Sequence, residues 1–199
     1  LERLSIVNED CFWLDFKKSF TAIRRKLDLD AISALERDPA AKSLREIYLA
    51  YPGFYAIAVY RLSNQLLRQK IPVLPRMMSA FAHGITGTDI HPNAEIGDSF
   101  FIDHATGIVI GETTIIKNNV TIFQGVTLGG IQAKKSMAFV KRHPTIENDV
   151  IIYANATILG GDVVIGAHSI IGANVCIMES TFENSVVVVQ SENKIFQSK

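Results

Sequence analysis

The chain carries an aliphatic residue at almost every sixth position between Asp89 and Ile177. A period of six is a multiple of the two-residue period of a strand, but not of the 3.6-residue period of a helix. It is typical of a parallel β-helix, a coil of short strands stacked on one another, and an ordinary β-sandwich is the alternative. The series consists of Ile90, Ile96, Ile102, Ile108, Ile110, Ile116, Ile122, Leu128, Ile146, Ile152, Ile158, Ile165, Ile171 and Ile177.

Three departures interrupt this spacing. The register steps by two between Ile108 and Ile110, one extra residue separates Ile158 from Ile165, and residues 129–141 fit no hexad. A solenoid that expels a loop usually does so on a working face, so we predict a loop there beside a functional site. The apolar segment 185–189 predicts a last strand that must be covered by the coil or by another subunit.

The first part of the chain carries helical patterns instead, such as the aromatic spacing of Phe12, Phe16 and Phe20. The predicted fold class is α+β, with an N-terminal α-helical domain over residues 1–85 and a β-helix domain with a C-terminal tail over residues 86–199. We predict helices over residues 11–36, divided at Asp28–Asp30 by the N-cap of a second helix, and over 40–50, 54–70 and 76–84.

Composition limits the possible partners. The formal net charge is zero, which argues against nucleic acid or an anionic membrane surface. No apolar run reaches the roughly 18 residues of a membrane span, and no signal peptide is recognisable. Cys11 and Cys176 lie in segments that we place in different parts of the fold, so we expect no disulfide framework and a reducing compartment, the cytoplasm.

Among the five histidines, His104 has the most informative surroundings. Asp103 precedes it, and Asp89 lies fifteen residues earlier. If a coil takes three hexads, about 18 residues, Asp89 and His104 can meet on adjacent coils. A carboxylate on one imidazole nitrogen orients the ring and leaves the other nitrogen as a base. A structural histidine is the alternative, and because zinc-ligand spacings are missing we expect no metal.

Arg142 and His143 stand where the predicted loop rejoins the coil. An arginine there can hold a carboxylate through two hydrogen bonds. A solvated charge at the base of a loop is the simpler interpretation. Asp38 precedes Pro39 at a helix junction, where the simpler interpretation is a polar group that ends the helix.

Seven motifs, in order along residues 11–178, resemble those of serine O-acetyltransferases. They are Asp38-Pro39-Ala40-Ala41, Tyr51-Pro52-Gly53-Phe54 with Tyr60-Arg61, Asp89-Ile90-His91-Pro92, Phe101-Ile102-Asp103-His104-Ala105-Thr106-Gly107, Gly111-Glu112-Thr113, Val126-Thr127-Leu128-Gly129-Gly130 and Arg142-His143-Pro144.

The resemblance implies a left-handed parallel β-helix of hexapeptide repeats after a helical domain. It implies homotrimers formed through the coils, commonly paired into hexamers through the helices. The implied reaction transfers acetyl from acetyl-CoA to the hydroxyl of L-serine for cysteine synthesis, without a metal. His104 matches the family's general base, Asp89 the residue that orients it, and His143 a second active-site histidine from a neighbouring subunit.

The resemblance also assigns groups that hold the substrate. Asp38 and Asp103 match carboxylates that bind the serine ammonium, and Arg142 matches the arginine that binds its carboxylate. Serine is a zwitterion, so a site with anionic groups, a cationic group and a base between them suits it.

Glycines and small residues complete the implied site. Backbone N–H groups at Gly129 and Gly130 are candidates for stabilising the oxyanion that forms at the thioester carbonyl. Acetyl-CoA would lie along a groove between neighbouring coils, where Ala154 and Gly172 let it approach closely.

The chain departs from the family pattern in three places. The loop from Gly130 to Arg142 is longer than in the common bacterial form, and Met137 and Phe139 make it less polar. Tyr153 and Asn155 replace small residues, so we expect different coenzyme packing. The tail ends without the isoleucine that docks into O-acetylserine sulfhydrylase, and we expect no such complex through it unless the tail is truncated here.

Two other hypotheses stay open. The chain could be a hexapeptide acyltransferase that acts on homoserine, an amino sugar or another small acceptor, and the altered loop motivates this. It could instead be a non-catalytic assembly or regulatory subunit, against which the retention of all six polar site residues argues.

Overall fold

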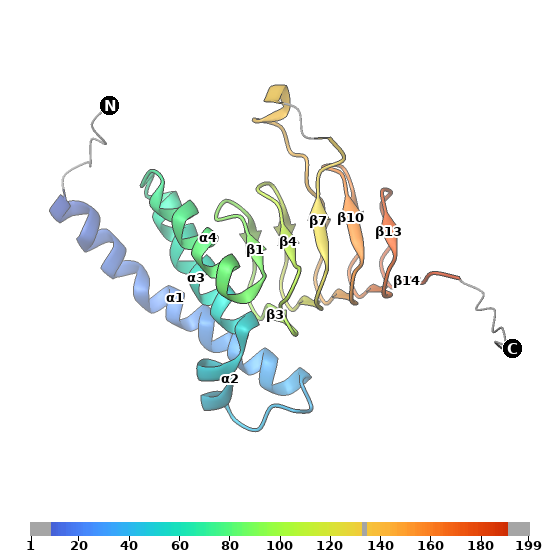
Figure 1. The fold of residues 1–199 in the computed structure, drawn as a ribbon, viewed down its shortest axis with the longest axis horizontal. Coiled ribbons are helices and arrows are strands. Elements are labelled where there is room, and N and C mark those ends of the chain that lie inside the picture. The colour runs from blue at the N-terminus through green and yellow to red at the C-terminus, as the bar shows by residue number, and fades with distance from the viewer. Residues whose placement is uncertain (1–8, 133–134, 191–199) are drawn as a thin grey trace, which may run out of the picture.

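The structure is a computed structural model that describes residues 9–132 and 135–190. A helical N-terminal region precedes a coil of short parallel strands, in the predicted order (Figure 1). The side chains of Cys11 and Met137, and the tail after residue 190, lie outside the described part, as do the predictions that rest on them. No helix in the described ranges is long and apolar enough to cross a membrane.

The first helix, α1 (Glu9–Arg37), is continuous, so the predicted division at Asp28 and Asp30 is wrong. These aspartates have partners in other helices instead of capping one of their own. Asp28 accepts a hydrogen bond from the Tyr48 hydroxyl at 2.6 Å, and Asp30 accepts one from Arg61. Long-range contacts therefore explain two acidic residues in the middle of a helix.

The other helices differ from prediction mainly at their ends. α2 (Leu44–Ala50) begins four residues later than predicted, because Ser43 caps it and accepts a backbone N–H of its first turn at 3.2 Å. α3 (Pro52–Arg68) begins at its proline, which suits a first turn because that position needs no N–H. α4 (Leu74–Thr86) ends at Gly87, whose φ of 72° closes the helix before the coil.

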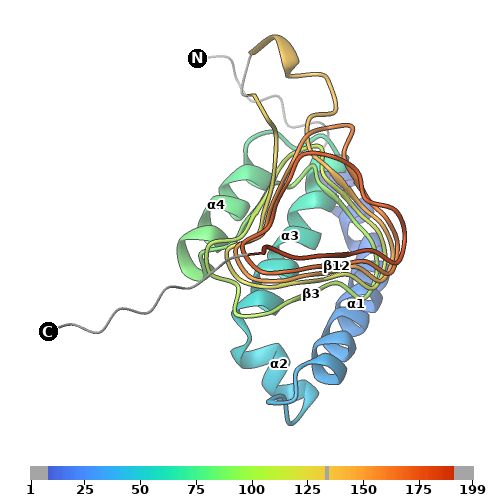
Figure 2. The ribbon, with the colours of Figure 1, turned by 90° about the vertical axis from the view of Figure 1, so that its right-hand side faces the viewer.

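The coil consists of three parallel sheets that enclose a triangular core (Figure 2). Sheet A has the order β1-β4-β7-β10-β13, sheet B β11-β8-β5-β2 and sheet C β14-β12-β9-β6-β3. The strands are β1 (Asp89–Ile90), β2 (Glu95–Ile96), β3 (Phe101–Ile102), β4 (Val109–Ile110), β5 (Ile115–Ile116), β6 (Thr121–Ile122), β7 (Thr127–Gly129), β8 (Thr145–Ile146), β9 (Ile151–Ile152), β10 (Thr157–Leu159), β11 (Val164–Ile165), β12 (Ile170–Ile171), β13 (Cys176–Ile177) and β14 (Val186–Val187).

The aliphatic series fills the inside of the coil, as its spacing predicts. Ile102, Ile122 and Ile152 stack in register through sheet C, and each is at most 1% exposed. The same buried cluster continues into α3 through Ala56 and Ile57. The helices and the coil therefore share buried surface, and a domain boundary between residues 85 and 86 stays a prediction.

The lengths of the coils follow the interruptions in the sequence. Ile110 pairs with Leu128, eighteen residues on, which is three hexads. Ile90 pairs with Ile110, twenty residues on, and Leu128 pairs with Ile158, thirty residues on. The first coil thus holds two extra residues, and the third expels the predicted loop, which contains the short helix η1 (Lys135–Met137).

A buried ion pair joins α1, α3 and the first coil. Arg61 Nε lies 2.5 Å from Asp30 Oδ2, and Arg61 Nη2 lies 2.7 Å from Asp30 Oδ1. The N–H of Phe100 donates to the same carboxylate at 2.9 Å, and Arg61 donates to the carbonyl of Gly97 at 2.9 Å. Burial raises the pKa of Asp30, and the hydrogen bond and charge of Arg61 oppose this shift.

The far end of the coil stays open in the single chain. Val186 and Val188 are 67% and 69% exposed. Within the described residues the coil therefore does not cover its own last strand, and cover by another subunit stays a prediction.

We predict that Arg61→Ala lowers the free energy of unfolding by about 3–5 kcal/mol, because it leaves the Asp30 carboxylate buried without its charge partner. Arg24→Ala is the matched control. Arg24 lies 3.8 Å from Asp28 on an exposed face of α1, and such pairs contribute about 0–1 kcal/mol. Urea unfolding measures both variants, and equal losses would show that the buried pair does not hold the helices on the coil.

Candidate active site

Most of the predicted site residues lie on two of the long edges of the coil. The edge between sheets C and A, which we call the His104 edge, consists of residues 103–108, 123–126, 153–156 and 172–175. The edge between sheets A and B, the His143 edge, consists of residues 91–94, 111–114, 130–132, 135–144 and 160–163. Figure 2 shows the expelled loop leaving one corner of the triangle, at the His143 edge.

His104 occupies the expansion of the first coil. The N–H of Asp103 and the carbonyl of Thr106 both make the regular hydrogen bonds to the next coil, each at 2.9 Å. The two extra residues are therefore His104 and Ala105, which lie between them. Both have left-handed backbone conformations, with φ of 59° and 69°, which cost free energy in residues that have side chains. Strain kept at such a turn is typical of a functional site.

The His104 imidazole is exposed, and its Nε2 lies 3.7 Å from Asp103 Oδ2. Asp89, the predicted orienting residue, stands on β1 and lies 3.8 Å from Nη1 of Arg76 in α4. The described residues contain no hydrogen bond or ion pair between Asp89 and His104. That pairing stays a prediction.

Asp38 lies beside Tyr51, near the ends of α1 and α2. The Tyr51 hydroxyl donates to Asp38 Oδ2 at 2.6 Å, and the N–H of Ala40 donates to Oδ1 at 2.8 Å. Burial raises the pKa of Tyr51, and the hydrogen bond to Asp38 and the charges of Asp38, Glu46 and Asp103 raise it further. A Cβ on Gly53, two residues after Tyr51, would lie 2.2 Å from the carbonyl oxygen of Ile102, the residue before Asp103, so Asp38 and Asp103 belong to the same region.

Ala154 and Gly172 lie further along the His104 edge. Neighbouring strands are about 4.8 Å apart, so Ala154, two coils beyond Asp103, lies about 10 Å along the edge. Tyr153 stacks on Phe123 beside it, with ring centroids 4.9 Å apart. An extended ligand could follow this edge from His104.

Arg142 enters the coil at the end of the expelled loop. Its Nη2 donates to the Glu112 carboxylate, and its Nη1 donates to the carbonyl of Ala138 at 3.2 Å. Gly129 ends β7, and a Cβ on Gly130 would lie 3.1 Å from the carbonyl oxygen of Arg142, so the two ends of the loop almost touch. A substrate carboxylate at Arg142 would share this guanidinium with Glu112 or displace Glu112 from it.

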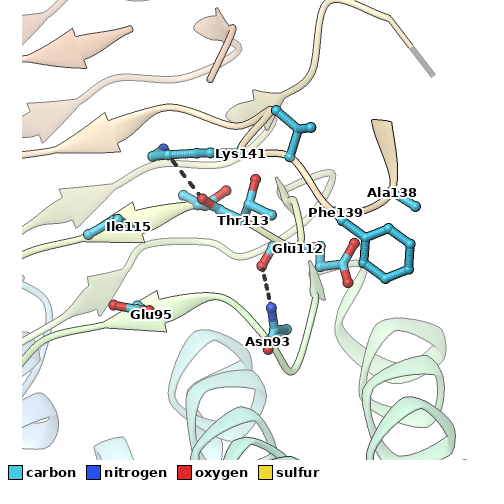
Figure 3. Close-up of a pocket in the computed structure, with 10 residues that line it drawn as sticks. Asn93, Glu95, Glu112, Thr113, Ile115, Ala138, Phe139 and Lys141 are labelled. Carbon is cyan, nitrogen blue, oxygen red and sulfur yellow. Dashed lines mark hydrogen bonds between the residues drawn. The ribbon is translucent and has the colours of Figure 1, made fainter. Parts of the chain in front are cut away.

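A hollow of about 390 Å³ opens beside the His143 edge (Figure 3). Its lining includes Phe139 and Lys141 from the loop and Glu95 and Glu112 from the coil. In Figure 3, Phe139 and Glu112 stand at one end of the hollow and Glu95 at the other. Phe139 is 102% exposed, so the predicted apolar character of the loop is presented to solvent.

The His143 imidazole is held through its Nδ1 atom. The N–H of Thr113 donates to Nδ1 at 3.1 Å, and Thr113 Oγ1 lies 2.8 Å from the same nitrogen. Burial, with a further contribution from the charge of Arg142, lowers the pKa of His143 to about 4, although Glu112 opposes the shift. The ring is therefore neutral at pH 7.

One chain brings the predicted residues together in two groups. Asp38, Asp103 and His104 gather near one edge, and Arg142 and His143 lie at the other, with sheet A between them. No hydrogen bond or ion pair among the described residues joins the groups. Within the same ranges, no cluster of three or more His, Cys, Asp or Glu side chains could hold a metal ion.

Sequence reasoning missed the partners of the predicted residues. Tyr51 hydrogen-bonds to Asp38, and Glu112 pairs with Arg142. Thr113 contacts the imidazole of His143. The signal for all three was present, because each belongs to a motif that resembles the family, but the motifs alone assigned them no contact.

Comparisons with known proteins agree with these motifs, although no family model matches the chain. The chain is 45% identical over 177 residues to "Serine acetyltransferase, plasmid" of Synechococcus elongatus, which covers 86% of the chain and 55%, about half, of that relative. It is 44% identical over 164 residues to serine acetyltransferase of Bacillus subtilis, which covers 82% of the chain and 73% of the relative.

A solved structure agrees as well. The crystal structure of Neisseria gonorrhoeae serine acetyltransferase in complex with serine superposes with a TM-score of 0.82 at 34% identity, over 90% of this chain and 71% of that one. With this identity and coverage in both sequence and structure, the chain belongs to the serine acetyltransferase family.

Proposed function

We propose that the chain transfers acetyl from acetyl-CoA to the hydroxyl of L-serine and releases O-acetyl-L-serine, an intermediate for cysteine synthesis, and coenzyme A. Family membership together with a charge set that suits a zwitterion supports this most directly. Carboxylates at Asp38 and Asp103, a guanidinium at Arg142 and an exposed imidazole at His104 make up the set. The relative solved in complex with serine supports serine as the acceptor.

His104 acts as the general base in this proposal. It takes the hydroxyl proton while the serine oxygen attacks the thioester carbonyl carbon. The C–S bond then breaks, and the coenzyme A thiolate takes the proton back from His104. Asp89 orients the imidazole, which requires that Asp89 exchange its contact with Arg76 for one with His104.

The remaining groups bind and stabilise. Asp38 and Asp103 hold the serine ammonium, and Arg142 holds its carboxylate. Backbone N–H groups at Gly129 and Gly130 are proposed to donate to the oxyanion of the tetrahedral intermediate.

Acetyl-CoA is proposed to lie along the His104 edge, where Ala154 and Gly172 leave room. Asn155 fills part of the space, since its Oδ1 would lie only 2.0 Å from a Cβ on Gly125. Asn155 and the ring of Tyr153 together leave less space for a ligand along this edge. The coenzyme contacts are therefore expected to differ from those of relatives with small residues here.

We propose that the complete site forms between copies of the chain, in a homotrimer of left-handed coils in the cytoplasm. The separation of the two edges by sheet A supports this, because a second copy could place its His143 edge against the first copy's His104 edge. The apolar hollow lined by Phe20, Ile23 and Tyr48 supports pairing of two trimers through the helices.

We predict that coenzyme A release depends on L-serine and that His104→Ala lowers turnover by about 10²–10⁴-fold. His83→Ala is the control and is expected to keep full activity, because His83 is an exposed histidine of α4. The assay compares serine, homoserine, an amino sugar and no acceptor. Release with another acceptor but not with serine would replace the proposed substrate. If His104→Ala kept more than about a tenth of wild-type turnover, His104 would not be the general base.

We also predict that two inactive variants restore each other. When His104→Ala and His143→Ala are co-expressed, about a quarter of head-to-tail interfaces combine an intact His104 edge with an intact His143 edge. In the control, His104→Ala is co-expressed with Asp103→Asn, and no interface regains an intact His104 edge. Absence of recovery in the first pair would mean that one chain supplies both histidines.

A further inference from the structure

The contacts of Thr113 fix which nitrogen of His143 carries the proton. The backbone N–H of Thr113 points at His143 Nδ1 across 3.1 Å. A backbone N–H can only donate, so Nδ1 must present a lone pair. In a neutral imidazole the other nitrogen, Nε2, then carries the hydrogen.

A count of the hydrogen bonds at the Thr113 hydroxyl also indicates that Nδ1 of His143 is unprotonated. Its Oγ1 accepts the N–H of Arg142 at 2.9 Å and the N–H of His143 at 3.1 Å. A hydroxyl has two lone pairs and one hydrogen. Both lone pairs are used, so the hydrogen points to His143 Nδ1, 2.8 Å away. Protonation of Nδ1 would therefore cost two hydrogen bonds.

Gly111 makes room for the ring in this position. A Cβ on Gly111 would lie 2.0 Å from His143 Cδ2 and 2.1 Å from Nε2. Nε2 makes no hydrogen bond to any described residue, so its N–H is available to donate a hydrogen bond to a ligand.

We propose that Thr113 is a positioning residue that locks His143 as the neutral Nε2–H tautomer, and that His143 serves the reaction as a hydrogen-bond donor and not as a second base. The inference rests on the proposed acetyl transfer. The acceptor is the thioester carbonyl oxygen, which becomes negative when serine attacks. A donor that is fixed beforehand stabilises this charge without reorganisation.

The step balances without a proton from His143. The serine proton passes to His104, the new C–O bond forms, and the carbonyl π pair moves onto the oxygen that faces the Nε2–H. When the C–S bond breaks, that pair restores the carbonyl, and the thiolate takes the proton from His104. His143 keeps its hydrogen throughout.

The charges that face His143 act mostly in the same direction. Burial is the largest cause of its lowered pKa of about 4. Arg142, His91 and Lys141 also disfavour a second proton on the ring, and Glu112 favours one. The lock is therefore expected to persist through the pH range in which a free imidazole titrates.

Nitrogen-15 NMR of the assembled enzyme, labelled in its histidines, tests the lock without any turnover. The His143 signals are identified by their loss in His143→Gln. We expect a protonated Nε2 and an unprotonated Nδ1, unchanged between about pH 5.5 and 8. A proton on Nδ1, or a titration midpoint near the ordinary value of about 6.5, would overturn the proposal.

Thr113→Val and Thr113→Ser form a matched pair, because only the serine keeps the hydroxyl. We expect Thr113→Val to raise the pKa of His143, because one of the two hydrogen bonds that keep Nδ1 unprotonated is lost while the backbone N–H remains. We also expect it to lower kcat by about 10–100-fold, with smaller changes in KM. Thr113→Ser should keep the wild-type pKa of His143 and the wild-type kcat. If Thr113→Ser changes both as Thr113→Val does, or if Thr113→Val changes neither, the hydroxyl does not set the tautomer.

His143→Gln separates a donor from a base, since an amide can donate near the position of Nε2 but cannot take a proton. We expect its turnover to exceed that of His143→Ala at least about tenfold. Equal inactivity of the two variants would overturn the donor role. If serine is not acetylated by the wild-type chain while the NMR pattern holds, the proposed function fails and the tautomer assignment stands.

Discussion

The stacking of one aliphatic side chain per hexad is the constraint on which the rest of the structure depends. Ile110, Leu128 and Ile158 follow one another in register along sheet A, and each is at most 1% exposed. A slip of one residue would turn every such side chain outward, at about 1.5–3 kcal/mol each. Extra residues must therefore leave through an edge, and the expansion at His104 and the loop before His143 do so.

The same constraint explains how much of the fold could be predicted. The hexads, the step of two and the expelled loop depend on local repetition, so the sequence alone indicated them. The continuity of α1 could not be predicted, because Asp30 is explained by Arg61, 31 residues away, and by the N–H of Phe100, 70 residues away. From the local pattern alone, an aspartate within a helical segment predicts the N-cap of a new helix. Only its distant partners in the structure show that the helix continues.

The candidate site was predictable as a set of residues but not as an arrangement. Motifs identified the candidate residues, yet the edge on which each one lies follows from coil lengths of twenty and thirty residues. Glu112 meets Arg142, and Thr113 meets His143, across sequence separations of 30. The length of the expelled loop sets those separations, so no fixed spacing rule identifies these partners in advance.

The division of the candidate residues between two edges has a geometric cause. A coil of stacked strands is convex, and its edges point away from one another (Figure 2). Small substrates bind in concave sites that surround most of their surface, so one chain cannot enclose a ligand between His104 and His143. In the trimer that we propose, two coils side by side would form a groove to which each contributes one edge. The tautomer of His143, in contrast, is fixed by Thr113 of the same chain, so its donor can be in place before any such groove forms.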